Sequence, residues 1–157
     1  MQITATVRLG LLSLVSAIGL GACASGDAIS KVKIFRLDST RRVTAADPAI
    51  AFEQRHYLHG AITAEEVRAR EGNYYTVFWS VADPRQPVTL RFEYRQAKTG
   101  SKVHVIESIF EDPSAQNTTD VQVIGDAFQQ GGSVLAWRAS LVRDKEILAT
   151  RRSYLWE

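Results

Sequence analysis

The chain has 157 residues, with 19 lysine or arginine and 17 aspartate or glutamate residues, and its formal net charge at pH 7 is +2. This balance excludes the strongly basic surface that nucleic-acid binding requires, so we expect no nucleic-acid partner. A single cysteine, Cys23, excludes a fold that is held together by internal disulfides.

Residues 1–22 predict an export signal that is cleaved. They hold one charge, Arg8, which is followed by a short apolar stretch and then by small residues, the layout of a secretory signal. The alternative is a membrane-spanning helix, because the uncharged run at 9–26 approaches the ~20 residues that cross a bilayer. Glycine and other small residues fill the second half of that run, and they gain little from hydrocarbon. We therefore expect the mature chain to begin at Cys23.

The residues at the expected cut, Leu20-Gly21-Ala22-Cys23, are an aliphatic residue, two small residues and a cysteine. They resemble the lipobox of bacterial lipoproteins. The resemblance implies a covalent diacylglycerol on the Cys23 thiol, which anchors the protein to a membrane of the cell envelope. Ala24, where members retained in the inner membrane often have aspartate, implies the periplasmic side of the outer membrane in a cell with two membranes. The alternative is an ordinary signal cut after Ala22 or Ala24, with the cysteine there by chance.

Residues 23–30 are mostly small or polar and predict a flexible tether, which spans at most about 25 Å when fully extended. We expect this tether to hold one domain, residues 31–157, close to the membrane surface.

Beyond the tether, apolar residues mostly alternate with polar ones, which predicts strands bounded by turns. The expected strands are 31–38, 55–62, 73–81, 88–96, 102–110, 120–124, 133–142 and 147–156. Within 102–110 the apolar phase changes between Val105 and Ile106, which predicts a bulge. Residues 143–146 are expected to form a hairpin tip.

One helix is expected at 63–71. Thr63 and Glu66 have the spacing of a capping box, in which each side chain bonds to the backbone of the other residue. Gly72 is expected to end this helix as a C′ residue.

About eight strands at intervals of roughly ten residues, with one short helix near 63–71, predict a mostly β fold, an antiparallel β-sandwich. The segment 74–156 resembles immunoglobulin-like and fibronectin type III-like domains in its strand rhythm. It has no paired cysteines, so the disulfide-linked antibody type is excluded. A small open barrel is the alternative fold.

The three histidines suggest a metal site, but their spacing does not favour one. On a strand, His56 and His59 point to opposite faces, and His104 lies far along the chain. No metal-binding motif accompanies them. We expect neither a metal nor any cofactor other than the lipid on Cys23.

No catalytic residues are predicted. The chain contains no G-x-S-x-G motif, and the lone thiol is assigned to the lipid. Carboxylates for glycoside chemistry can be assembled from distant strands, so an enzyme with a site built from loops stays open.

A candidate binding surface is indicated by aromatic residues at 74–81, where both strand faces are apolar. One face is expected in the core with Trp137, and the other is either covered by the 63–71 helix or exposed for binding. The candidate surface residues are Tyr74, Thr76, Phe78, Arg151, Arg152 and Trp156. The alternative for the two arginines is a solvated edge strand that charge protects from pairing.

These observations favour a non-catalytic, lipid-anchored β-sandwich that faces the periplasm and binds a protein or an envelope glycan. The alternative is a structural or assembly subunit of an outer-membrane complex, and an enzyme is the third hypothesis.

Overall fold

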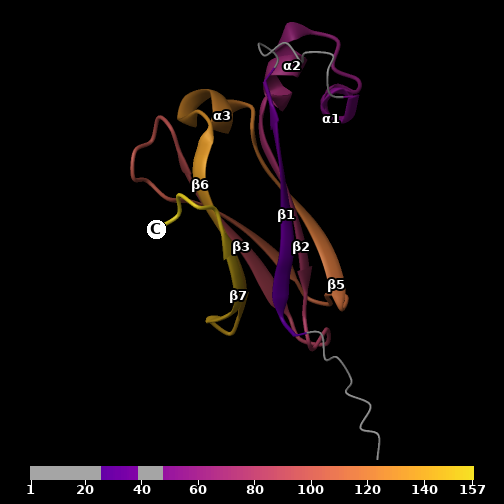
Figure 1. The fold of residues 1–157 in the computed structure, drawn as a ribbon, viewed down its shortest axis with the longest axis vertical. Coiled ribbons are helices and arrows are strands. Elements are labelled where there is room, and N and C mark those ends of the chain that lie inside the picture. The colour runs from indigo at the N-terminus through magenta and orange to yellow at the C-terminus, as the bar shows by residue number, and fades with distance from the viewer. Residues whose placement is uncertain (1–25, 39–47) are drawn as a thin grey trace, which may run out of the picture.

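The computed structural model describes residues 26–38 and 48–157, so Cys23 and the rest of the lipobox lie outside the described residues. Two antiparallel sheets pack face to face, with three short helices at one end (Figure 1). The strands are β1 (Ala28–Leu37), β2 (Gly72–Ser80), β3 (Val88–Gln96), β4 (His104–Phe110), β5 (Gln116–Ile124), β6 (Val134–Arg143) and β7 (Glu146–Arg152). The helices are α1 (Pro48–Leu58), α2 (Ala64–Arg70) and α3 (Asp126–Gly131). The predicted antiparallel β-sandwich is confirmed.

The two sheets divide the strands unequally. One sheet has three strands in the order β1-β2-β5, and the other has four in the order β4-β3-β6-β7. Every neighbouring pair is antiparallel, and each long strand places alternate side chains in the core and on the outer face. The outer faces are therefore set by the residues that alternate with the core positions.

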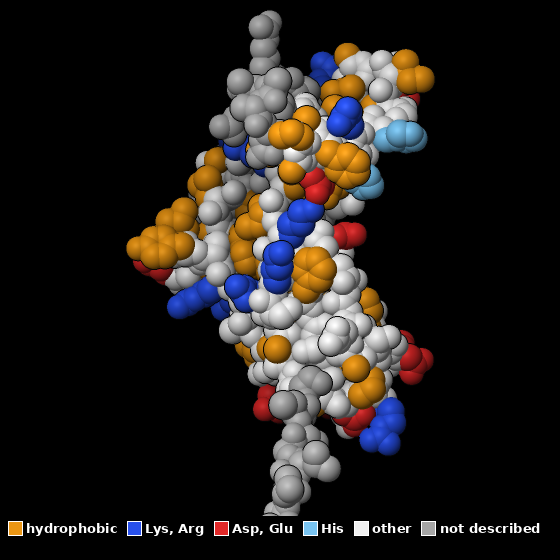
Figure 2. Space-filling model, turned by 45° about the vertical axis from the view of Figure 1, so that its right-hand side comes forward, with side chains coloured by type: hydrophobic (Ala, Val, Ile, Leu, Met, Phe, Trp, Pro, Cys, Tyr) orange, Lys and Arg blue, Asp and Glu red, His pale blue; other side chains and the backbone are white. Residues whose placement is uncertain are grey.

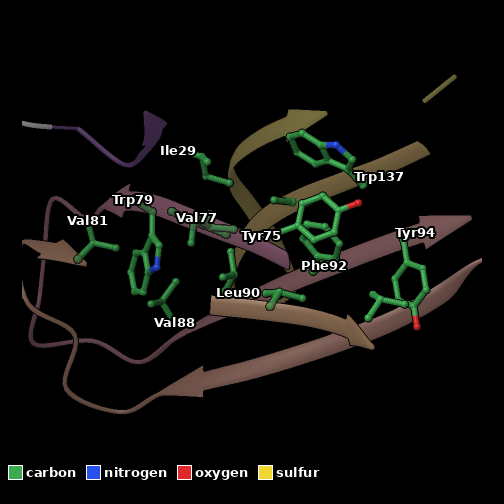
Figure 3. Packing of buried hydrophobic residues seen from close by; sticks show 14 residues of the cluster. Ile29, Tyr75, Val77, Trp79, Val81, Val88, Leu90, Phe92, Tyr94 and Trp137 are labelled. Atoms are coloured by element: carbon green, nitrogen blue, oxygen red, sulfur yellow. The ribbon is translucent and has the colours of Figure 1, made fainter. Parts of the chain in front are cut away.

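The core lies between the inner faces of the sheets, where Tyr75, Phe92 and Trp137 pack together (Figure 3). The ring centres of Tyr75 and Phe92 are 4.7 Å apart, and those of Phe92 and Trp137 are 5.9 Å apart. Trp79 is 2% exposed and donates from Nε1 to Thr119 Oγ1 at 2.9 Å, so its polar atom is satisfied inside the core. Removal of this apolar surface from water is the main driving force for the fold.

The capping box predicted at Thr63 is present at the start of α2. Glu66 N donates to Thr63 Oγ1 at 3.2 Å, and Glu66 Oε2 accepts from Thr63 N at 2.9 Å. Gly72 occupies the predicted C′ position, directly after the C-cap residue Glu71, but it does not have the left-handed helical conformation of such a cap and is already the first residue of β2. Its φ is +150°, and a Cβ there would lie 2.2 Å from Val123 O, so only glycine allows β2 to approach β5 at this point.

The strand predicted at 55–62 is wrong, because residues up to Leu58 belong to helix α1. Pro48 occupies the first position of the helix, where its fixed φ and missing N–H are tolerated. The helix is stabilised by contacts with distant parts of the chain, above all by Tyr57, which packs against side chains of β1 and β2.

The start of the domain also differs from the prediction. β1 begins at Ala28, so residues 28–30 belong to the sandwich and not to a tether. The two residues before it are also bound, since Ser80 Oγ donates to Gly26 O at 3.1 Å and Asp27 Oδ1 accepts from Ala82 N at 3.0 Å. The chain is therefore fixed to the domain from Gly26 onward.

The bulge predicted in β4 is absent, since β4 pairs with β3 without a register shift. Val105 and Ile106 are both aliphatic, but their side chains lie on opposite faces of the sheet. Ile106 packs on the core, whereas Val105 lies on the outer face and is 53% exposed. The register shifts in this sheet lie instead at Leu135 in β6, which is 55% exposed, and at Leu148 in β7.

Candidate functional site

A cavity of about 680 Å³ lies between α1 and the outer face of the three-stranded sheet. Strands β1, β2 and β5 supply its floor, and α1 with the end of α2 supplies its upper wall. Basic, acidic, histidine and hydrophobic side chains all gather on this face, below the helices (Figure 2).

Tyr57 of α1 forms the upper wall. Its ring stacks on Phe35 at 5.1 Å between centres and lies 4.0 Å from the ring centre of Tyr74. Through these two rings Tyr57 anchors α1 on the outer face of β1 and β2 while it also lines the cavity. The predicted surface residue Tyr74 is consequently 5% exposed, covered by α1 where the 63–71 helix was the expected cover.

Polar contacts hold α1 against the rest of the domain. Lys33 on β1 forms an ion pair with Glu53 on α1. Arg70 at the end of α2 donates from Nη1 to Tyr57 O at 3.2 Å and also to His59 O. Tyr74 donates from its hydroxyl to Arg70 O at 2.5 Å, which links the sheet to both helices.

The floor of the cavity is polar. Thr76 and Asp120 are neighbours across β2 and β5, and Thr76 Oγ1 donates to Asp120 Oδ1 at 2.8 Å. Thr118 and Gln122 flank Asp120 on the same face of β5, and all three are exposed. Thr118 and Gln122 make no side-chain hydrogen bond to another residue of the described chain, so their polar groups are available to a ligand.

Two pKa shifts describe the electrostatics of the cavity. Burial raises the pKa of Tyr57, and the negative charges of Glu53 and Asp120 raise it further. The hydrogen bond to Glu53 raises the pKa of Lys33. At neutral pH the phenol is therefore a hydrogen-bond donor, and Lys33 stays charged.

The other predicted surface residues lie elsewhere. Phe78 is half-buried on the same sheet face, next to Thr118, but Arg151 donates from Nη1 to Ile29 O at 3.3 Å and to Ser30 O at 2.6 Å, across the gap between the sheets. Arg152 lies on β7 of the four-stranded sheet, directly opposite Arg138 of β6 in the strand register. The two arginines therefore do not extend the surface around Thr76, whereas Phe78 lies on the same sheet face.

Trp156 lies on the four-stranded sheet and is 5% exposed. The guanidinium carbons of Arg95 and Arg138 are 4.9 and 5.1 Å from its ring centre. Arg138 also forms a two-pronged ion pair with Glu93, with N–O distances of 2.7 and 2.9 Å. The six predicted surface residues are thus divided between two sheets.

Sequence reasoning missed the residues of α1 that face the cavity, Phe52, Glu53 and His56. Phe52 and His56 are four residues apart, the spacing that places side chains on one helix face. That spacing, together with Pro48, was the available signal.

The histidines are not brought together. His56 lines the cavity and His59 follows α1, whereas His104 stacks on Tyr94 in the other sheet at 5.1 Å between ring centres. Across residues 26–38 and 48–157 no group of three or more His, Cys, Asp or Glu side chains is placed to hold a metal ion. None of the helices in these ranges is long and apolar enough to cross a membrane.

Comparisons with protein-family models, curated proteins and solved structures found no match. The chemistry of the cavity is therefore the basis on which a function can be inferred.

Proposed function

We propose that this protein is a non-catalytic, lipid-anchored module of the cell envelope that binds a glycan in the cavity beside α1. One observation carries the proposal: a single hollow combines polar side chains on its floor with the ring of Phe52, which is 63% exposed, on its wall. Its volume of about 680 Å³ lies within the range of roughly 300–1,000 Å³ for small-molecule sites.

The lining suits a sugar because sugars carry hydroxyls, which both donate and accept hydrogen bonds, and C–H faces, which pack on aromatic rings. Asp120 supplies an acceptor, and Gln122 and Thr118 supply both donors and acceptors. Phe52, which is 63% exposed, supplies an accessible aromatic ring.

Charge further narrows the ligand to a neutral one. The lining contains two cations, Lys33 and Arg70, and two carboxylates, Glu53 and Asp120. Lys33 is paired with Glu53, and Arg70 is bound to backbone carbonyls of the α1 segment. The two positive and two negative charges cancel, so the lining has no net positive charge that would select a phosphate or a carboxylate, whereas hydroxyl groups need no opposite charge.

Binding without catalysis is supported by the surroundings of the two carboxylates in the cavity, Glu53 and Asp120. Glu53 is paired with Lys33, and Asp120 is exposed and accepts from Thr76, so neither carboxylate lies in the apolar pocket that is typical of a catalytic general acid. The raised pKa of Tyr57 removes it as a base. These groups are arranged to hold hydroxyls.

The lipid anchor is proposed from Leu20-Gly21-Ala22-Cys23, and the fold is compatible with it. β1 begins at the end of the sandwich opposite α1 and α2 (Figure 1). A lipid on Cys23, three residues before Gly26, would place the membrane near that end and would leave the cavity directed away from it. The ligand would then be a glycan that extends from the membrane or lies above it.

Sedimentation with insoluble cell-envelope polysaccharide tests the glycan. We expect the purified full chain to bind, and the Gln122→Ala variant to bind about tenfold more weakly, the loss of roughly 1.4 kcal/mol that one or two hydrogen bonds supply. Phe52→Ala should lose more. The matched controls are Gln130→Ala for Gln122→Ala and Tyr154→Ala for Phe52→Ala, because both control residues are exposed and neither lines the cavity. Equal binding by a variant and its control contradicts the proposal.

Membrane fractionation tests the anchor separately. The Cys23→Ala variant should be released from membranes that retain the native chain. If it remains with membranes after a carbonate wash, the lipid anchor is wrong.

A further inference from the structure

Edge strands expose backbone N–H and C=O groups that can pair with another chain, and proteins usually protect them with bulges, charges or covering segments. Among the described edge strands, β1 and β7 carry such protection, and the outer face of the third edge, β5, is polar, with Asp120 at its centre. A register shift follows Ile29 in β1, and another lies opposite Leu141 in β7. Arg151 also donates to backbone carbonyls of β1 from β7, which closes the gap between these two edges.

The edge strand β4 lacks this protection. It pairs with β3 in unbroken register, and it contains neither proline nor bulge. Its outer face alternates Val105, Glu107 and Ile109, and the two aliphatic side chains are 53% and 67% exposed. The long, flat, apolar edge is the kind that forms a sheet with a further strand.

We propose that β4 pairs in antiparallel register with β4 of a second copy of this chain, about a two-fold axis at Glu107. The axis must pass between two copies of the same residue, and not between two adjacent positions of the strand, because both strands have to place their core residues on the same side of the joined sheet. With the axis at Glu107, Val105 of each copy lies opposite Ile109 of the other. With the axis at Ile106 or Ser108, an aliphatic residue lies opposite Glu107 instead. The sequence of β4 thus matches itself in one of these three registers.

The charges of the outer face permit this register. Two Glu107 carboxylates lie side by side at the axis, and like charges directly opposite each other oppose pairing. Each carboxylate already accepts from its own Arg91 Nε at 2.6 Å. Charges across the joined sheet therefore run Arg91, Glu107, Glu107, Arg91, which is neutral in sum. The pairing is complementary but small in area, so the dimer is weak and concentration-dependent.

Cysteine cross-linking tests the register in the full chain, purified in mild detergent and carrying Cys23→Ser so that the introduced cysteine is the sole thiol. Under mild oxidation, and in parallel with a short thiol-specific cross-linker, Glu107→Cys should yield dimers with itself. Val105→Cys alone should yield few, and a mixture of the Val105→Cys and Ile109→Cys variants should yield many. Ile34→Cys, a 51% exposed residue on the protected edge β1, is the matched control.

Equal cross-linking of Val105→Cys and Glu107→Cys, or no excess over Ile34→Cys, overturns the proposal. A non-covalent measurement is also needed, because a cross-linking yield can be changed by unfavourable disulfide geometry or by misfolding of a variant. In sedimentation equilibrium, the Cys23→Ser chain should associate as concentration rises, and Val105→Lys in the same background should remain monomeric with an unchanged circular-dichroism spectrum. Association that survives Val105→Lys also overturns the proposal. None of these outcomes depends on the glycan, because β4 and the cavity lie on different sheets.

Discussion

The two outer faces of this sandwich differ although both are built on the same core. On the three-stranded sheet, α1 covers one end of the face and leaves a polar hollow beside it. On the four-stranded sheet no such helix lies over the strands that are described. Its face carries paired charges, Arg91 with Glu107 and Glu93 with Arg138, and ends in an apolar edge.

The difference shows how one framework can present two kinds of surface. Helices α1 and α2 lie between β1 and β2 in the chain, and they convert a flat sheet into a concave site suited to a small ligand. A sheet without this addition offers a flat face and a backbone edge, which suit another protein chain. We expect variants to affect the two surfaces separately unless they disturb the core between them.

The largest effect is expected from Phe92→Ala, because this ring contacts Tyr75 of one sheet and Trp137 of the other. Truncating a fully buried phenylalanine leaves a cavity and costs about 3–5 kcal/mol in the free energy of unfolding. Urea unfolding followed by tryptophan fluorescence measures the loss. Glycan binding and β4 cross-linking should fail together near the new midpoint, and failure of one alone would show that the sheets do not share their stability.

Tyr57→Ala should separate the two surfaces. It removes the ring contacts with Phe35 and Tyr74, at about 0.5–1.5 kcal/mol each, and it frees α1 from the sheet. We expect glycan sedimentation to be lost and cross-linking through Glu107→Cys to be unchanged. Tyr154→Ala is the control, since that tyrosine is 98% exposed. Normal glycan binding by Tyr57→Ala would mean that α1 is not a wall of the site.

Trp156→Ala makes the opposite test on the four-stranded sheet. The ring is held between Arg95 and Arg138, and two cation–π contacts of about 0.5–1 kcal/mol each predict a loss of roughly 1–2 kcal/mol in unfolding free energy. Thermal unfolding measures it, and glycan binding should stay intact. A parallel fall in glycan affinity would indicate coupling between the faces that we do not expect.

The smallest effect is expected from Glu66→Gln in the capping box. Hydrogen bonds from the backbone N–H groups of Thr63 and Ile62 lower the pKa of Glu66 below its usual value of 4.5. A lowered pKa stabilises the folded state above the unfolded-state pKa, and this contribution disappears as the pH falls through the folded-state pKa. The variant should therefore unfold at slightly lower temperature than the native chain at pH 7, and the difference should shrink below pH 4. A difference that grows on acidification would contradict the assignment.

Where local rules decide the structure, the sequence was sufficient. Alternation at 88–96 defines β3, and the Thr63–Glu66 pair defines the start of α2, since both depend on neighbours in the chain. Tyr57 shows where this fails. Whether its segment forms a strand or a helix is decided by rings on β1 and β2, and the local pattern contains neither contact.

The candidate site was not predicted, because the helix that forms its wall was not predicted. Asp120 was placed on a strand correctly, but its importance depends on a wall that the sequence pattern had assigned to another strand. Val105 shows the opposite error. Its aliphatic side chain was assumed to be buried, so a bulge was inferred where the strand is regular and the residue is exposed.

The fixed start of β1 also determines how the domain responds to force. Gly26 and Asp27 are bound to the segment after β2, and β1 runs antiparallel along β2 from Ala28 to Leu37. Hydrogen bonds between antiparallel strands lie across the strand direction. A pull through the residues before Gly26 and along the strands, against a ligand held at the far end, loads many of these bonds in shear at once. This geometry predicts that the domain resists a pull along β1 better than a pull that separates the strands one bond at a time.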